Sequence, residues 1–116
     1  MERSRPLPKL AFVTPNLQDD MHDGTVQQGD GWLKAHLDGY IQWAKMHNSL
    51  LILTWDEDDL LQGNYIATIF VGAHVKAGQY GEAVNHYSVL STIEDIYGLP
   101  YARNASVGMV IRDIWQ

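Results

Sequence analysis

Apolar residues in this chain form three short continuous runs. The runs are "LAFVT" at 10–14, "SLLILTW" at 49–55 and "YIATIFVG" at 65–72. Short apolar runs bounded by turn residues are typical of strands buried on both faces, and the third run is also rich in β-branched and aromatic residues. We therefore predict three strands at these positions.

Two further stretches place apolar residues at the spacing of an α-helix. Their apolar positions are Leu33, Leu37, Tyr40, Ile41 and Ala44 within 29–46, and Val89, Leu90, Ile93 and Tyr97 within 85–97. Asp30 precedes the first set as a plausible N-cap. Gly98, followed by Leu99 and Pro100, is a helix stop for the second set. We predict helices over both stretches.

Alternating strands and helices indicate an α/β fold with a mostly parallel sheet and flanking helices. The length of 116 residues predicts a single domain over 1–116, with a core of its own. Residues 1–9, with prolines at 6 and 8, are expected to form an extended lead-in. The tail "MVIRDIW" at 109–115 is predicted to be either an edge strand or a packing arm.

Composition narrows the classes of partner and of metal site. Apolar residues make up 46% and charged residues 19% of the chain, which is a globular balance. The net charge of −6, without a basic block, argues against nucleic-acid binding. There are no cysteines, so a metal would need oxygen and imidazole ligands. The first ten residues lack the apolar stretch of a secretory signal, and no window approaches the roughly 20 apolar residues of a membrane span.

The stretch "NLQDDMHDG" at 16–24 follows the first predicted strand and contains four candidate ligands. They are Asp19, Asp20, His22 and Asp23. Carboxylates with an imidazole suit zinc, iron or manganese, whereas carboxylates alone favour magnesium or calcium. A solvated turn, in which Asp and Asn side chains hydrogen-bond to nearby backbone, is the alternative interpretation.

A second acidic cluster, "DEDD" at 56–59, follows the second predicted strand. Four adjacent negative charges repel one another, which a bound cation would relieve, although a solvated loop explains such a run as well. Chemistry in α/β sheets gathers at the carboxyl ends of the strands, where both clusters are predicted to lie. His86 of "NHYS" is placed at a helix start, where backbone N–H groups favour an anion such as phosphate.

Several of these stretches, in this order, resemble the C-terminal part of the phosphoesterase family. They are "LAFVTPNLQDDMHDGTVQQGDGWL", "NSLLILTWDEDD", "IATIFVG", "NHYSVLSTIEDIYGLPY" and "DIW". That family includes acid phosphatases and bacterial phospholipases C, and it belongs to the alkaline phosphatase superfamily. The resemblance runs from about residue 7 to residue 115 and implies part of an alkaline-phosphatase-like core.

The resemblance implies a metal-dependent phosphoric-ester hydrolase acting on phosphate esters. Carried over by motif, Asp20, His22, Asp23 and His86 would be catalytic-site residues, and Asp56 and Glu57 would be metal ligands. The ion would be zinc, manganese, iron or calcium. Family members are often secreted or periplasmic, although this chain shows no signal peptide, so its location stays open.

One feature of the family is missing from this sequence. The Glu-Asn-x-Ser type of motif, which brings further metal ligands and precedes the nucleophile, does not occur. We therefore expect an incomplete site, and the alternative is a catalytically silent α/β fragment. A surface that the rest of the family fold would cover is expected to drive homo-oligomer formation.

Overall fold

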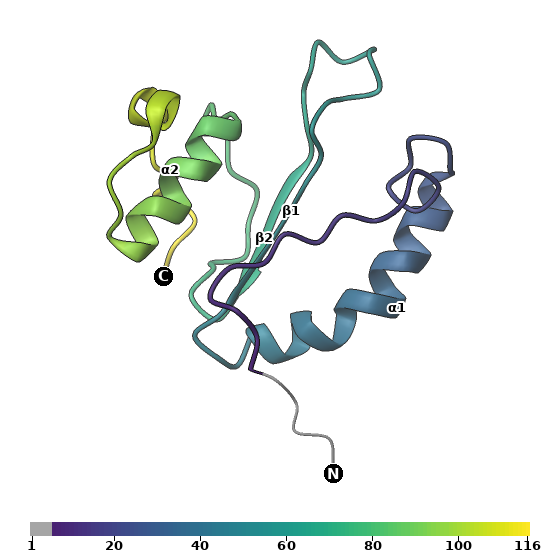
Figure 1. Cartoon of the computed structure of the whole chain (residues 1–116), viewed down its shortest axis with the longest axis horizontal. Helices are drawn as coiled ribbons and strands as arrows, with labels where there is room; N and C mark the ends of the chain where they lie inside the picture. Colours follow the sequence, from purple (N-terminus) through teal and green to yellow (C-terminus); the bar gives the residue numbers. More distant parts are fainter. Residues whose placement is uncertain (1–5) are drawn as a thin grey trace. The chain divides into compact units, whose positions relative to one another are not determined.

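The computed structural model describes residues 6–116. Its elements follow the order helix, strand, strand, helix and short 3-10 helix (Figure 1). The elements are α1 (Val26–Ala44), β1 (Leu50–Thr54), β2 (Thr68–Gly72), α2 (His86–Tyr97) and the 3-10 helix η1 (Arg103–Val107). The chain divides into two compact units, Met1–Gln42 and Trp43–Gln116, called the N-terminal and C-terminal units below. No helix in residues 6–116 is both long and apolar enough to cross a membrane.

Helix α1 confirms the helix predicted over 29–46, but its start differs from the prediction. The helix begins at Val26, and the hydroxyl of Thr25 accepts a hydrogen bond from the Gln28 N–H at 3.2 Å, as an N-cap residue does. The predicted N-cap, Asp30, lies inside the helix. The predicted start was wrong because it was taken from the regularly spaced apolar residues, whereas the helix includes about one more turn before them.

The strand predicted at 10–14 is absent from the N-terminal unit as the structure describes it. Residues 11–16 have no regular secondary structure, and the side chains of Leu10, Phe12 and Val13 are exposed, Phe12 to 84%. An apolar run becomes a strand only when another strand takes up its backbone N–H and C=O groups. The apolar pattern indicated a segment suited to burial, but it could not show whether another strand lies beside that segment.

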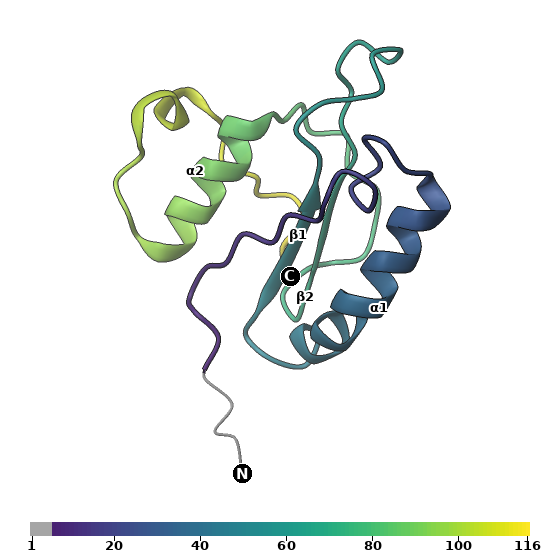
Figure 2. The same cartoon turned by 45° about the vertical axis from the view of Figure 1, so that its right-hand side comes forward.

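The C-terminal unit contains an antiparallel two-stranded sheet, so the prediction of a mostly parallel sheet was wrong. Strand β1 pairs with β2 from Leu50 opposite Gly72 to Thr54 opposite Thr68. A parallel pair needs a crossover connection, usually a helix, whereas the connection over 55–67 is a loop (Figures 1 and 2). Both strands lie within their predicted runs, and the hydroxyls of Thr54 and Thr68 approach to 3.0 Å at the end of the sheet.

Helix α2 begins and ends where the sequence predicts. The Asn85 side chain accepts from the Ser88 N–H at 3.1 Å, and the Ser88 hydroxyl accepts from the Asn85 N–H at 3.2 Å, which completes a capping box. Gly98 ends the helix with a φ of 63°, a conformation that glycine adopts without steric cost. Both ends of the helix are therefore determined locally.

Polar contacts hold the C-terminal tail against α2. The buried hydroxyl of Thr92 donates to the Ser88 carbonyl at 2.7 Å and accepts from the Ile111 N–H at 2.9 Å. The carboxylate of Glu94 accepts from the Ala102 N–H at 3.0 Å. Ile111 and Ile114 are buried, and a single bridge pairs Trp115 with Val75. The tail is thus the packing arm that the sequence analysis considered.

The loop between β1 and β2 is organised by Asp58. Its carboxylate accepts from the N–H groups of Leu60, Gln62 and Asn64 at 2.8–2.9 Å. Leu60 and Asn64 have φ values of 66° and 63°, which turn the chain sharply. Desolvation raises the pKa of Asp58, but the backbone donors outweigh it, so the pKa lies below its usual value of 3.8.

Replacement of Gly108 tests how closely the tail packs on α2. A Cβ at this position would lie 2.5 Å from the carbonyl carbon of Tyr87 and 2.7 Å from the Ser91 hydroxyl oxygen. We expect Gly108→Ala to lower the free energy of unfolding by about 1–3 kcal/mol, because backbone atoms cannot yield. Chemical denaturation followed by tryptophan fluorescence measures the change. Gly81→Ala, where a Cβ meets nothing within 4 Å, is the matched control, and equal effects of both variants would contradict the packing.

Acid titration tests the role of Asp58 in the loop. A carboxyl group whose pKa is depressed on folding stabilises the fold above its unfolded pKa and loses that contribution as the pH falls through its folded pKa. We therefore expect the Asp58 carboxyl to titrate below 3.8 by NMR, and the amide signals of Leu60 and Asn64 to move with it. A midpoint at or above 3.8, or loop amides that move independently of Asp58, would contradict this role.

Candidate functional site

The end of β1 and the start of α2 meet through one hydrogen bond. Nε2 of His86 lies 2.9 Å from the backbone carbonyl oxygen of Asp56, although the two residues are 30 positions apart. Asp56 follows β1 by two residues, and His86 is the first residue of α2. The structure therefore brings together two of the residues singled out in the sequence.

This contact determines the tautomer of His86. A carbonyl oxygen can only accept, so Nε2 carries the proton and donates it. In the neutral ring, Nδ1 is then an acceptor with a lone pair. Histidines that bind metals are commonly held in this way, with the second ring nitrogen donating to a backbone carbonyl or a carboxylate. The ring of His86 is thus oriented as a metal ligand or proton acceptor would be.

The charges around His86 come from the helix and from the adjacent loop. The start of α2 carries partial positive charge, because the first N–H groups of a helix lack intrahelical acceptors. Asp56 and Glu57, both exposed, contribute two carboxylates beside the carbonyl that holds His86. Oδ1 of Asp56 accepts from the Glu57 N–H at 3.1 Å. A cation near the carboxylates and an anion near the helix start would each be favoured electrostatically.

The four acids at 56–59 have different roles in the structure. Asp58 accepts three backbone hydrogen bonds within the loop, and Asp59 accepts one from the Leu61 N–H at 3.2 Å. The hydrogen bonds of Asp58 and Asp59 stabilise the loop, so turn formation accounts for two of the four acids. Asp56 is the member of the run whose backbone contacts His86, and Glu57 follows it in the sequence.

The first acidic cluster forms an ordered turn in the N-terminal unit. The Asn16 side chain accepts from the N–H groups of Gln18 and Asp19, both at 3.0 Å, and donates to the Asp19 carboxylate at 2.9 Å. A Cβ at Gly24 would overlap the Gln18 carbonyl oxygen, so the chain can close here only with glycine. The interpretation of this stretch as a turn therefore applies to residues 16–19.

Directly after that turn, the predicted residues Asp20 and Asp23 each form a hydrogen bond with His22. The Asp20 carboxylate accepts from the His22 backbone N–H at 2.9 Å. Nδ1 of His22 lies 2.9 Å from the Asp23 carboxylate, with the two side chains 66% and 50% exposed. A carboxylate at this distance orients the ring. His22 and Asp23 form a pair suited to ligand binding or proton transfer.

The donor atoms of the C-terminal unit suit a divalent ion only in part. Asp56, Glu57 and His86 offer the oxygen and imidazole ligands that zinc or manganese accept. Nevertheless, no three His, Asp or Glu side chains among residues 6–116 are arranged closely enough to hold a metal ion by themselves. The residues fit part of a ligand set that other donors would have to complete.

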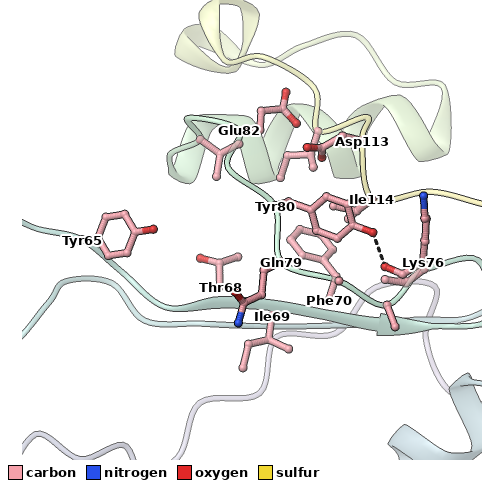
Figure 3. A pocket seen from close by; sticks show the side chains of 15 residues that line it. Tyr65, Thr68, Ile69, Phe70, Lys76, Gln79, Tyr80, Glu82, Asp113 and Ile114 are labelled. Carbon is pink, nitrogen blue, oxygen red and sulfur yellow. Dashed lines mark hydrogen bonds between the residues drawn. The ribbon is translucent and has the colours of Figure 1, made fainter.

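Sequence reasoning missed a cavity of about 570 Å³ in the C-terminal unit, shown in Figure 3. It is lined by β2, the segment 75–84 and the tail, including Phe70, Tyr80 and Glu82. These residues belong to three segments with no motif in common, so no spacing signal could have indicated the cavity.

Comparison with known proteins identifies a family and several relatives of this chain. A model of the Phosphoesterase family matches residues 3–100. A Mycobacterium tuberculosis protein named phosphatidylinositol-3-phosphatase is 55% identical over 94% of this chain and 36% of its own length. An Aspergillus fumigatus acid phosphatase is 29% identical over 96% of this chain and 26% of its own, and a probable acid phosphatase of Kluyveromyces lactis is 32% identical over 82% and 24%. No solved structure matches the chain significantly.

The chain spans about a third of the length of the mycobacterial relative and about a quarter of the fungal ones. The family match covers most of the sequence, including both acidic clusters and His86. The chain belongs to the Phosphoesterase family.

Proposed function

We propose that this chain contributes to the metal-dependent hydrolysis of phosphoric esters, with its chemistry centred on Asp56, Glu57 and His86. The observation that carries the proposal is the hydrogen bond from His86 Nε2 to the Asp56 carbonyl, which leaves Nδ1 as the acceptor of the ring and joins His86 to the acidic run at 56–59. Family membership supports phosphoester hydrolysis as the reaction.

In this proposal, Asp56 and Glu57 bind a divalent ion, and His86 either joins them through Nδ1 or contacts the phosphoryl group. When bound, the ion neutralises negative charge on the phosphoryl oxygens. The Asp56 carbonyl prevents the His86 ring from turning, so the acceptor atom is positioned before the ester arrives. The positive end of α2 favours the same negatively charged group.

We propose that Asp20, His22 and Asp23 serve the same reaction from the N-terminal unit. The 2.9 Å contact between the His22 ring and the Asp23 carboxylate supports a role in proton transfer or in binding the ion. The attacking serine or threonine would come from a segment outside this sequence, because the motif that precedes it in the family does not occur here.

The substrate is proposed to be a phosphate monoester. The relatives named as acid phosphatases and as a phosphatidylinositol phosphatase support this class, and their names do not decide between a soluble ester and a lipid. The ion is proposed to be zinc, manganese, iron or calcium, because imidazole and carboxylate ligands accept all four, calcium less readily.

Turnover of p-nitrophenyl phosphate tests the proposal on the purified, tag-free chain. We expect slow hydrolysis that requires added Mn²⁺ or Zn²⁺ and is abolished by chelation, because groups around a missing nucleophile still leave residual catalysis. Asp56→Asn keeps the acceptor for the Glu57 N–H but removes the charge. We expect it to lower the remaining metal-dependent rate by about 10- to 100-fold, because it removes a negative charge from the proposed ligands of the ion.

Asp59→Asn is the matched control, because it removes the same charge from the same acidic run. Asp59 serves only the loop in this account, so the variant should retain the wild-type rate within about twofold. Hydrolysis that is independent of metal, or equal losses in both variants, would contradict the assignment. Turnover no faster than buffer would overturn catalysis by this chain alone and favour the catalytically silent alternative.

A further inference from the structure

Gly29 is the position at which helix α1 meets the acidic stretch at 16–24. Among residues 6–42, only Gly29 is buried. A Cβ on Gly29 would lie 2.6 Å from Cγ and 3.0 Å from Sδ of Met21, and 3.1 Å from the carbonyl oxygen of Asp19. A side chain therefore does not fit at this position, and glycine lets the stretch fold back against the first turns of the helix (Figures 1 and 2).

The three glycines of helix α1, Gly29, Gly31 and Gly39, differ in what surrounds them. Glycine inside a helix is less favourable than alanine, because it loses more backbone entropy on folding. A Cβ at Gly31 or Gly39 would meet nothing within 4 Å, whereas a Cβ at Gly29 would collide with Met21. The contact with Met21 is therefore a physical reason for glycine at position 29, and the other two positions provide matched controls.

Met21, on the other side of this contact, has an unusual backbone conformation. Its φ of 76° lies in the left-handed region, which is unfavourable for a residue that carries a Cβ. The Asp20 carboxylate spans Met21 by accepting from the His22 N–H at 2.9 Å. A residue keeps such a conformation only where its surroundings hold it, and conformations of this kind are frequent at functional sites. The local hydrogen bond and the packing on Gly29 are the two contacts that hold Met21.

The conformation of Met21 determines the direction in which the chain enters His22. The His22 ring lies with Nδ1 2.9 Å from the Asp23 carboxylate, and this contact depends on the backbone at these two residues. If the thioether lost its place on Gly29, Met21 would be free to relax toward a negative φ. The backbone would then turn differently before His22, and its ring would lose its fixed relation to Asp23.

We propose that Met21 and Gly29 are positioning residues for His22 and Asp23. The thioether of Met21 packs on the backbone of Gly29, and this contact holds the left-handed turn that directs the His22 ring toward the Asp23 carboxylate. Packing without a positioning role would stabilise the fold and leave the ring unaffected. The inference rests on the role proposed for His22 and Asp23 in hydrolysis, but the contact itself is tested without turnover.

The ¹⁵N NMR signals of the His22 ring test the positioning at a fixed alkaline pH, at which histidine rings are neutral. A carboxylate only accepts, so the contact with Asp23 keeps the ring proton on Nδ1, and the wild type should show mainly this tautomer. Gly29→Ala should lower the share of this tautomer about twofold or more, because a ring without its fixed partner populates both forms. Gly31→Ala, the matched control, should leave the share unchanged. A wild-type ring in Gly29→Ala, or equal changes in both variants, would overturn the proposal.

Variants of Met21 test the same contact without adding atoms to the helix, so they decide the matter even if Gly29→Ala does not fold. Met21→Ala should change the His22 ring as Gly29→Ala does, and the double variant should show no larger change, because both substitutions remove one contact. Met21→Leu retains an apolar side chain of similar size and should keep the wild-type tautomer.

Ring signals and turnover fail independently of each other. The expected ring changes without any hydrolysis of p-nitrophenyl phosphate would support the positioning and reject the proposed function. A wild-type ring in Met21→Ala, or additive changes in the double variant, would reject the positioning whatever the turnover.

Discussion

The hydrogen bond between the His86 ring and the Asp56 carbonyl is the interaction on which the candidate site depends. It connects the end of β1 to the start of α2 and leaves Nδ1 as the acceptor of the ring. Without it, the imidazole would be a mobile exposed side chain at a helix start, and the two carboxylates at 56–57 would differ little from any acidic loop. The contact therefore joins a distant histidine to the acidic run and fixes the orientation of its ring.

The rest of the C-terminal unit keeps that contact in place. The capping box of Asn85 and Ser88 fixes where α2 begins, and hence where His86 lies. Asp58 shapes the loop on the other side of the contact by accepting three backbone N–H groups. The Thr92 hydroxyl ties the helix to the tail. Local polar contacts, more than a large apolar core, thus position the candidate site.

Features determined locally were predictable from the sequence, and features that depend on neighbouring segments were not. Helix α2 was predicted at both ends because Asn85 and Gly98 act within one turn of their own positions. The apolar pattern at 10–14 indicated burial but could not supply a pairing strand, and the direction of β1 against β2 depended on a loop. The contact between Asp56 and His86 joins residues too distant for any spacing rule. The turn residues at 63–64 were the one available signal that Asp58 would serve the loop.

The predicted homo-oligomer and the identity of the ion stay predictions, whereas membership of the Phosphoesterase family is established. The most direct measurement of the central claim is the paramagnetic broadening that Mn²⁺ causes in the NMR spectrum of the chain. If Asp56, Glu57 and His86 hold a divalent ion, the signals of Glu57 and His86 should broaden at the lowest Mn²⁺ concentrations. The Asp56→Asn variant should remove this broadening. Broadening that begins at Asp58 and Asp59, with His86 unaffected, would contradict the account.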